Sequence, residues 1–250
     1  MKYYLSTIDP SAHLTAKNYG LGLEIAEYCT AWNMDEKLHE TDNAVRKKLT
    51  GIADRVFHGP FNELFPCAID PLARELARYR YRQAITLAQK YGAKKIVLHG
   101  GYNPRLYYPV WYTEQSVLFW KDFIKELPED MQIVLENVLE EEPEIILAIV
   151  RQVGDPRLRL CLDIGHVNAY SSISVTQWLE VCFPFISHFH IHNNAGDWDT
   201  HSALMQGTID MAAFLKKAEE LCPEATVTLE LMDGEPSVRW IKEELWNSFR

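Results

Sequence analysis

The run QIVLE, residues 132–136, carries the pattern from which the fold can be inferred. It is a short apolar segment that ends in an ionisable side chain, and a longer segment with helical spacing follows it. Eight short apolar runs, most of them ending in this way, recur along the chain, and their alternation with helical segments is typical of βα units around a parallel sheet. The runs cover residues 3–8, 21–25, 55–58, 95–99, 132–136, 159–163, 187–192 and 226–230.

Helical spacing is expected in eight further segments, near 11–18, 35–50, 71–91, 113–126, 143–153, 175–182, 210–221 and 236–247. Eight strands and eight helices in 250 residues predict an α/β fold, a single (β/α)₈ TIM barrel that forms one domain over residues 1–250. A doubly wound sheet is the alternative. No linker rich in Gly, Ser or Pro divides the chain.

Composition and charge narrow the functional classes. Lys and Arg number 25 against 35 Asp and Glu, so the net charge of −10 is opposite in sign to that of a general nucleic-acid binder. The one basic stripe, Arg74, Arg78 and Arg82, is expected on a solvated helix face.

The N-terminus lacks an apolar signal segment and no stretch approaches the ~18 apolar residues that span a bilayer, so we expect a cytoplasmic protein with no membrane partner. Five cysteines without CxxC spacing are predicted to be free thiols.

Ionisable side chains close six of the runs. They are His58, His99, Glu136, Asp163, His192 and Glu230. The carboxyl ends of barrel strands meet on one face, so these side chains are expected to converge, and strand alternation points His188 and His190 inwards as well. Because buried carboxylates are costly without a partner, the pattern predicts a divalent cation. Mixed carboxylate and imidazole ligands suit Mn²⁺, Zn²⁺, Fe²⁺ or Co²⁺ better than Ca²⁺.

Short motifs accompany nearly every predicted strand. In chain order they are LGLEI (21–25), HGPF (58–61), VLHGG (97–101), VLEN (134–137), CLDIGH (161–166), HIHNN (190–194), DTH followed by QG (199–207) and TLE (228–230). Together they resemble the xylose isomerase-like barrel superfamily. That superfamily includes sugar isomerases and epimerases as well as the endonuclease IV type of apurinic-site endonuclease, from AP endonuclease family 2.

The resemblance implies a ligand set. In the isomerases and epimerases one metal, Mn²⁺, Zn²⁺, Co²⁺ or Mg²⁺, is held by positions that match Glu136, Asp163, His190 and Glu230, and the two glutamates face each other across the substrate as acid and base. In the endonuclease branch a cluster of up to three zinc ions uses further positions. These match His58, His99, His166, Asp199 and His201.

Three functions remain open at this point. We expect a sugar or sugar-phosphate isomerase or epimerase that works through an enediolate; the alternatives are a multinuclear zinc phosphoesterase of the endonuclease IV type and a non-catalytic sugar-binding barrel. Short strand-to-helix loops, the acidic charge and the sequence Met205-Gln206-Gly207 in place of the usual GEG disfavour nucleic acid as the partner. The absence of Arg between residues 193 and 215 disfavours an epimerase.

Several side chains are candidates for contact with a carbohydrate substrate. His192, Asn193 and Trp198 lie beside the expected metal in sequence, while Tyr102 and Arg105 belong to the aromatic segment 100–113. Aromatic faces with a single Arg suit a sugar or a small anion. The alternative is that this segment packs against a helix or against a second subunit of a homo-oligomer.

Overall fold

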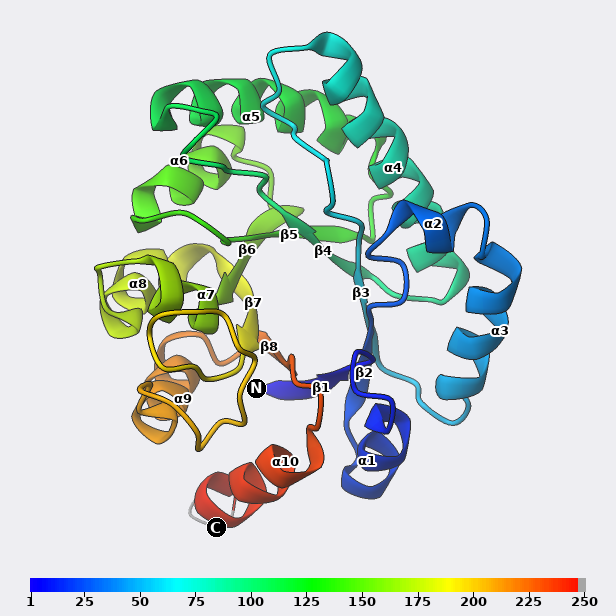
Figure 1. Cartoon of the computed structure of the whole chain (residues 1–250), viewed down its shortest axis with the longest axis vertical. Coiled ribbons are helices and arrows are strands. Elements are labelled where there is room, and N and C mark those ends of the chain that lie inside the picture. Colours follow the sequence, from blue (N-terminus) through cyan, green and yellow to red (C-terminus); the bar gives the residue numbers. More distant parts are fainter. Residues whose placement is uncertain (247–250) are drawn as a thin grey trace.

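Eight parallel strands close into a barrel in the computed structural model, which describes residues 1–246. Neighbours in the barrel are consecutive in the chain, and β8 pairs with β1 to complete the ring (Figure 1). The TIM barrel is therefore confirmed over the doubly wound sheet. The strands are β1 (Lys2–Ser6), β2 (Gly22–Ile25), β3 (Arg55–His58), β4 (Lys95–His99), β5 (Gln132–Glu136), β6 (Leu158–Asp163), β7 (Ile186–Ile191) and β8 (Thr226–Leu229).

Helices surround the ring of strands in Figure 1. They are α1 (Ala12–Tyr19), α2 (Ala31–Met34), α3 (Leu38–Lys48), α4 (Pro71–Lys90), α5 (Pro109–Phe123), α6 (Pro143–Val153), α7 (Ile164–Tyr170), α8 (Val175–Cys182), α9 (Met211–Leu221) and α10 (Glu235–Ile241). Short 3₁₀ turns η1 (Ile124–Glu126) and η2 (Phe183–Phe185) follow α5 and α8, and a π-helical turn η3 (Lys242–Trp246) follows α10. No helix within residues 1–246 is long and apolar enough to cross a membrane.

Some helix boundaries differ from the sequence-based expectation. Helix α5 begins at Pro109 rather than at residue 113, because proline suits the first turn of a helix. Helix α7 was not expected; it has only seven residues, too few for a clear periodic pattern, and the side chain of Asp163 caps it by accepting a hydrogen bond from His166 N. Helix α2 precedes the segment expected at 35–50. The segment expected at 236–247 begins at Glu235, and residue 247 lies outside the described residues.

Alternate strand residues point into the barrel. Five of the inward residues form an apolar cluster, Tyr4, Val56, Val97, Val134 and Cys161. Polar inward residues lie beside this cluster, since Cys161 pairs with both Glu136 and His188. The alternate residues Leu23, Phe189 and Ile191 are fully buried against the helices, as the strand pattern predicts. Strand register places several polar inward residues beside one another. His99 pairs with Glu136, Asp163 with His190 and His190 with Thr228.

Candidate metal centre

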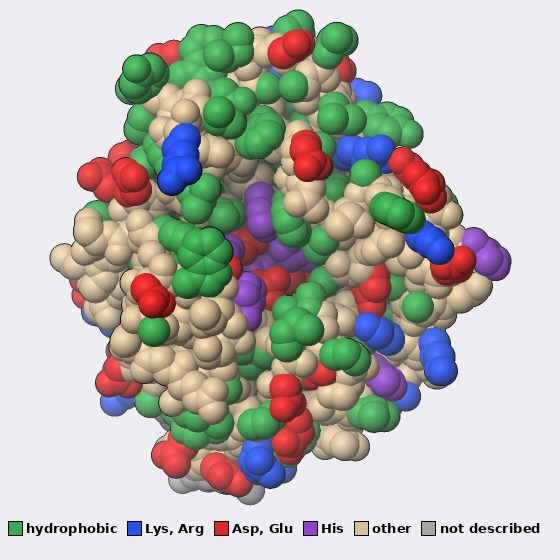
Figure 2. Space-filling model, in the orientation of Figure 1, with side chains coloured by type: hydrophobic (Ala, Val, Ile, Leu, Met, Phe, Trp, Pro, Cys, Tyr) green, Lys and Arg blue, Asp and Glu red, His purple; other side chains and the backbone are tan. Residues whose placement is uncertain are grey.

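The four expected ligands of a single metal converge at the upper end of the barrel. One ligand atom each from Glu136, Asp163, His190 and Glu230 lies within 4.8 Å of the others. His190 Nδ1 is 3.1 Å from Glu136 Oε1, 3.4 Å from Glu230 Oε2 and 3.9 Å from Asp163 Oδ2. Three of the side chains are buried, and Glu230 is 12% exposed. Figure 2 shows this face hollowed at its centre, with histidine and acidic side chains at the floor.

A second group of ligand atoms shares Glu136. His58 Nε2 and His99 Nε2 lie 3.4 and 3.3 Å from Glu136 Oε2. That oxygen is buried and has no hydrogen-bond partner. A buried anionic oxygen without a hydrogen bond is costly, and a cation held between it and the two imidazoles would offset that cost.

A third group forms around Asp199. Its Oδ2 lies 3.2 Å from His166 Nε2 and 3.1 Å from His201 Nε2, and its Oδ1 lies 3.5 Å from His192 Nε2. Oδ1 is also buried without a hydrogen-bond partner. His201 has a positive φ of 46°, a backbone conformation uncommon outside glycine and often found at functional sites. His192, predicted to contact the substrate, lies within this group of candidate ligands.

The histidines are held so that one ring nitrogen of each faces the carboxylates. Nδ1 of His58, His166 and His201 donates to the backbone carbonyl of Gly59, Asn137 and Glu230, at 2.9, 2.8 and 2.8 Å. With the proton fixed on Nδ1, the lone pair on Nε2 of each histidine points toward the carboxylate of its own ligand group, Glu136 for His58 and Asp199 for His166 and His201. This arrangement, in which a backbone acceptor fixes the tautomer, is typical of metal-ligating histidines. The donor set therefore fits divalent metal ions.

The carboxylates of the centre are ionised despite their burial. Burial alone would raise the pKa of Glu136, but electrostatic attraction to the neighbouring imidazoles of His190 and His99 and the hydrogen bond with His190 hold it well below its usual value. The pKa of Asp163 is likewise lowered, because His166 and His192 outweigh its burial. The centre therefore presents anionic oxygens at neutral pH, as a divalent ion requires.

Glu24 in β2 was missed by the sequence-based prediction. Its side chain is fully buried at the centre, where its carboxylate lies 3.0 Å from His190 Nε2 and 3.1 Å from His188 Nε2. Strand alternation contains the signal, since Leu23 and Ile25 point to the helices and leave Glu24 inside the barrel.

The candidate substrate residues have different surroundings. Asn193 is buried, and its Nδ2 donates to the carbonyls of Leu204 and Ile209 at 2.8 and 3.1 Å, which braces the loop that carries Asp199. Tyr102 is 5% exposed with its ring 4.9 Å from that of Tyr112. Arg105 and Trp198 are exposed, Trp198 to 67%.

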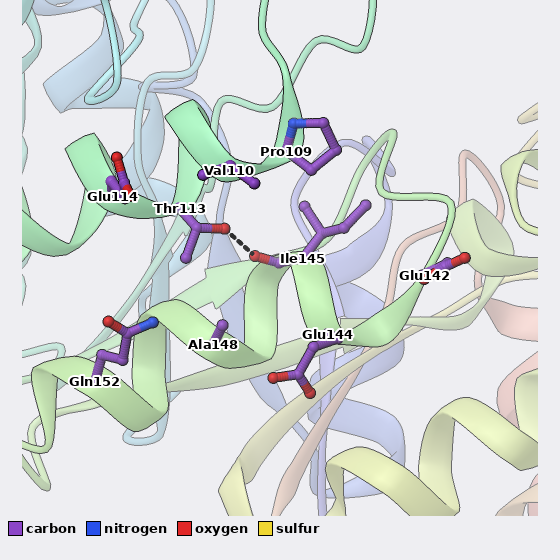
Figure 3. Close-up of a pocket in the computed structure, with 9 residues that line it drawn as sticks. All are labelled: Pro109, Val110, Thr113, Glu114, Glu142, Glu144, Ile145, Ala148 and Gln152. Atoms are coloured by element: carbon purple, nitrogen blue, oxygen red, sulfur yellow. Dashed lines mark hydrogen bonds between the residues drawn. The ribbon is translucent and has the colours of Figure 1, made fainter.

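A separate cavity lies outside the barrel, between α5 and α6 (Figure 3). It has a volume of about 400 Å³, and Val110, Ile145 and Ala148 contribute apolar surface while Glu114 and Glu144 contribute acidic side chains. Thr113 Oγ1 donates to the carbonyl of Ile145 across it at 3.3 Å. Because no imidazole lines this cavity, it is not part of the metal centre.

Comparison with known proteins agrees with the fold. Residues 20–246 match a family model described as the xylose isomerase-like TIM barrel. An uncharacterized protein of Methanocaldococcus jannaschii, MJ1311, is 30% identical over 207 residues, which cover 76% of this chain and 69% of that protein. A probable endonuclease 4 of Ureaplasma parvum is 24% identical over 196 residues, or 70% of this chain and 64% of that protein.

Solved structures with the same fold span both chains almost completely. A D-tagatose 3-epimerase-like protein superposes with a TM-score of 0.78 at 22% identity and covers 99% of this chain and 98% of its own. The TTHB071 protein of Thermus thermophilus, from a structure described as soaking with ZnCl2, also has a TM-score of 0.78 at 22% identity, with 99% of both chains covered. At these identities the likeness concerns the fold.

Proposed function

The chain belongs to the xylose isomerase-like TIM barrel family, and from this premise we propose that it is a divalent-metal-dependent isomerase or epimerase of a sugar or sugar phosphate. The observation that carries the proposal is the convergence of two carboxylates, Glu136 and Glu230, on His190 Nδ1. They come from β5 and the end of β8, with two strands between them, and so approach the centre from different sides.

The metal would be held by Glu136, Asp163, His190 and Glu230. Their anionic oxygens and the available Nδ1 of His190 suit Mn²⁺, Zn²⁺, Co²⁺ or Mg²⁺. When bound, the ion would supply a Lewis acid that polarises a substrate carbonyl.

The two glutamates do the proton transfer. One carboxylate removes the proton from the carbon next to the carbonyl, which leaves an enediolate. The other carboxylate returns a proton to carbon. Return to the carbonyl carbon, together with transfer of the hydroxyl proton from the one oxygen to the other, isomerises the sugar; return to the opposite face of the same carbon inverts that carbon. General acid and base catalysis of this kind contributes about 10² to 10⁴ to the rate.

The substrate would enter through the hollow in Figure 2. Trp198 is the exposed aromatic side chain next to the ligand Asp199 in the chain, and its indole face suits the apolar face of a sugar ring. Asn193 would brace the loop that carries Asp199 rather than bind the substrate, because its amide is already hydrogen-bonded within that loop.

A second candidate is a phosphoesterase with two or three metal ions. The observation that favours it is the presence of the two further ligand groups, His58 and His99 on Glu136, and the histidines on Asp199. An isomerase with one ion does not need them. Abasic DNA is a poor substrate for this surface, however, since Arg78 and Arg82 are both paired with Glu126 on the outer helices.

The two candidate functions can be distinguished by the number of metal ions per chain and by the incorporation of deuterium into the substrate. The purified chain would be loaded with Zn²⁺ or Mn²⁺, its metal content measured by mass spectrometry, and a panel of ketoses and ketose phosphates incubated in D₂O. One ion per chain and deuterium at the carbon beside the carbonyl would support the isomerase or epimerase. Two or three ions, no deuterium and hydrolysis of an abasic-site duplex or a small phosphodiester would support the phosphoesterase instead.

A further inference from the structure

We propose that Glu24 is a positioning residue for the metal centre, and that it holds the imidazole of His190 with Nδ1 facing the other three ligands. The inference rests on the metal centre of the proposed function. It concerns a residue that would not itself bind the ion, and it assigns a role to the buried carboxylate beneath the centre.

The two ring nitrogens of His190 face different partners. Nδ1 faces Glu136 and Glu230, whereas Nε2 lies 3.2 Å from Glu24 Oε2, to which it is hydrogen-bonded, and 3.0 Å from Glu24 Oε1. The nitrogens of an imidazole point away from each other, so an ion bound at Nδ1 is out of reach of Glu24. A carboxylate can only accept, which holds a proton on Nε2, so that an ion displacing the proton between Nδ1 and Glu136 Oε1 would meet the Nδ1 lone pair.

Glu24 is itself held in place by neighbouring strands. Thr228 Oγ1 donates to Glu24 Oε2 at 2.7 Å, and His188 Nε2 lies 3.1 Å from the same oxygen. Glu24, His188 and Thr228 are all fully buried. The carboxylate therefore has one orientation available, and His190 is fixed relative to it.

A glutamine at this position would have the same shape with different hydrogen-bonding groups. Both carboxylate oxygens lie within 3.2 Å of His190 Nε2, so in either orientation the new amide sets its NH₂ group beside the Nε2 proton and only its neutral oxygen remains to accept that proton. The hydrogen bond that orients His190 is then weaker than the one to a carboxylate, and the metal should be bound less tightly.

The test is zinc affinity, measured by isothermal titration calorimetry on the full chain after its metal has been stripped with a chelator. We expect Glu24→Gln to bind the first Zn²⁺ about 10- to 100-fold more weakly than the wild type, the usual effect of removing the partner of a ligating histidine. The matched control is Glu27→Gln. Glu27 is bonded to Lys48 and Thr7, away from the centre, and its variant should bind zinc within about twofold of the wild type.

Glu136→Gln serves to separate this inference from the proposed function. If Glu136→Gln weakens zinc binding while Glu24→Gln binds as the wild type does, the centre stands and the role of Glu24 is wrong. If neither variant weakens binding, the centre itself is wrong and the inference falls with it.

A second pair of variants covers the case in which Glu24→Gln does not fold. Thr228→Val removes only the hydroxyl that orients Glu24, and we expect it to weaken zinc binding several-fold, while Thr228→Ser restores the affinity. Equal affinity for the Val and Ser variants would overturn the proposal. Circular dichroism and thermal unfolding of each metal-free variant would establish that the fold is retained.

Discussion

The side-chain amide of Asn137 forms two hydrogen bonds to the backbone of Asp163. Its Nδ2 donates to the Asp163 carbonyl and its Oδ1 accepts from the Asp163 N–H, both at 2.9 Å. The residue that follows Glu136 thus fixes the end of the next strand, and with it the position of a second metal ligand.

Asn137→Asp should weaken both the fold and the metal centre. A carboxylate still accepts from the Asp163 N–H, but it cannot donate to the carbonyl, and leaving a buried group unsatisfied costs about 1 to 3 kcal/mol. We expect urea unfolding to report a loss of this size and calorimetry to report weaker zinc binding. Asn33→Asp is the control, because Asn33 also donates to a backbone carbonyl, that of Glu27, away from the ligands. Weakened zinc binding in both variants would mean that the Asn137 bridge has no special link to the centre.

Glu136→Gln and Glu230→Gln should each reduce turnover by at least about 10² at saturating metal, because each removes one of the two groups that exchange protons with substrate. Turnover would be measured on the sugar found by the D₂O screen. Glu144→Gln, on the outer helix α6, should retain wild-type rates. Full activity in either of the first two variants would rule out the two-glutamate mechanism.

Gly165→Ala should disturb the ligand group around Asp199. A Cβ at this position would lie 1.8 Å from the nearest ring atom of His192, so the imidazole must move. We expect weaker binding of additional zinc ions, with a lower melting temperature. Gly20→Ala is the matched change, since its Cβ would meet nothing within 4 Å and only its φ of 69° adds strain. An unchanged zinc titration in Gly165→Ala would exclude His192 from the group.

The pH dependence of stability should change in Glu140→Gln. Burial raises the pKa of Glu140 from 4.5 to about 7, so the folded chain keeps a proton that the unfolded chain releases near its ordinary value. The unfolded state therefore binds fewer protons between these values, and this residue lowers stability as the pH rises from 4.5 to about 7. Above pH ~7 the penalty is on the order of 3 kcal/mol.

Glutamine does not titrate, so its variant should lack this penalty. Urea unfolding at about pH 5 and about pH 8, on either side of the raised pKa, would show a smaller decrease in stability for Glu140→Gln than for the wild type. Tyr112→Phe, which removes only a hydroxyl that donates to Glu140, should retain the decrease. An equal decrease in the free energy of unfolding between the two pH values for wild type and Glu140→Gln would contradict the raised pKa of Glu140.

The strand pattern predicted most of the barrel because strand alternation and apolar runs are local properties of the sequence. Strand-end residues such as Glu136 and Asp163 could be located for the same reason. Glu24 could not, because its role depends on Thr228 and His190, which lie about 200 and 170 residues away in the chain and become neighbours only when the barrel closes. The place of His192 depends on how closely its ring packs against Gly165, which no periodicity reveals.

The bond between Thr228 and Glu24 also bears on how the chain is made. Glu24 belongs to the second strand to leave the ribosome, while its hydroxyl donor belongs to the last. During synthesis an N-terminal half-barrel would have to bury this carboxylate with none of its three donors present, which is strongly unfavourable. Burial of Glu24 at low cost therefore requires the last strand, and we expect the barrel to close only after β8 has been synthesised.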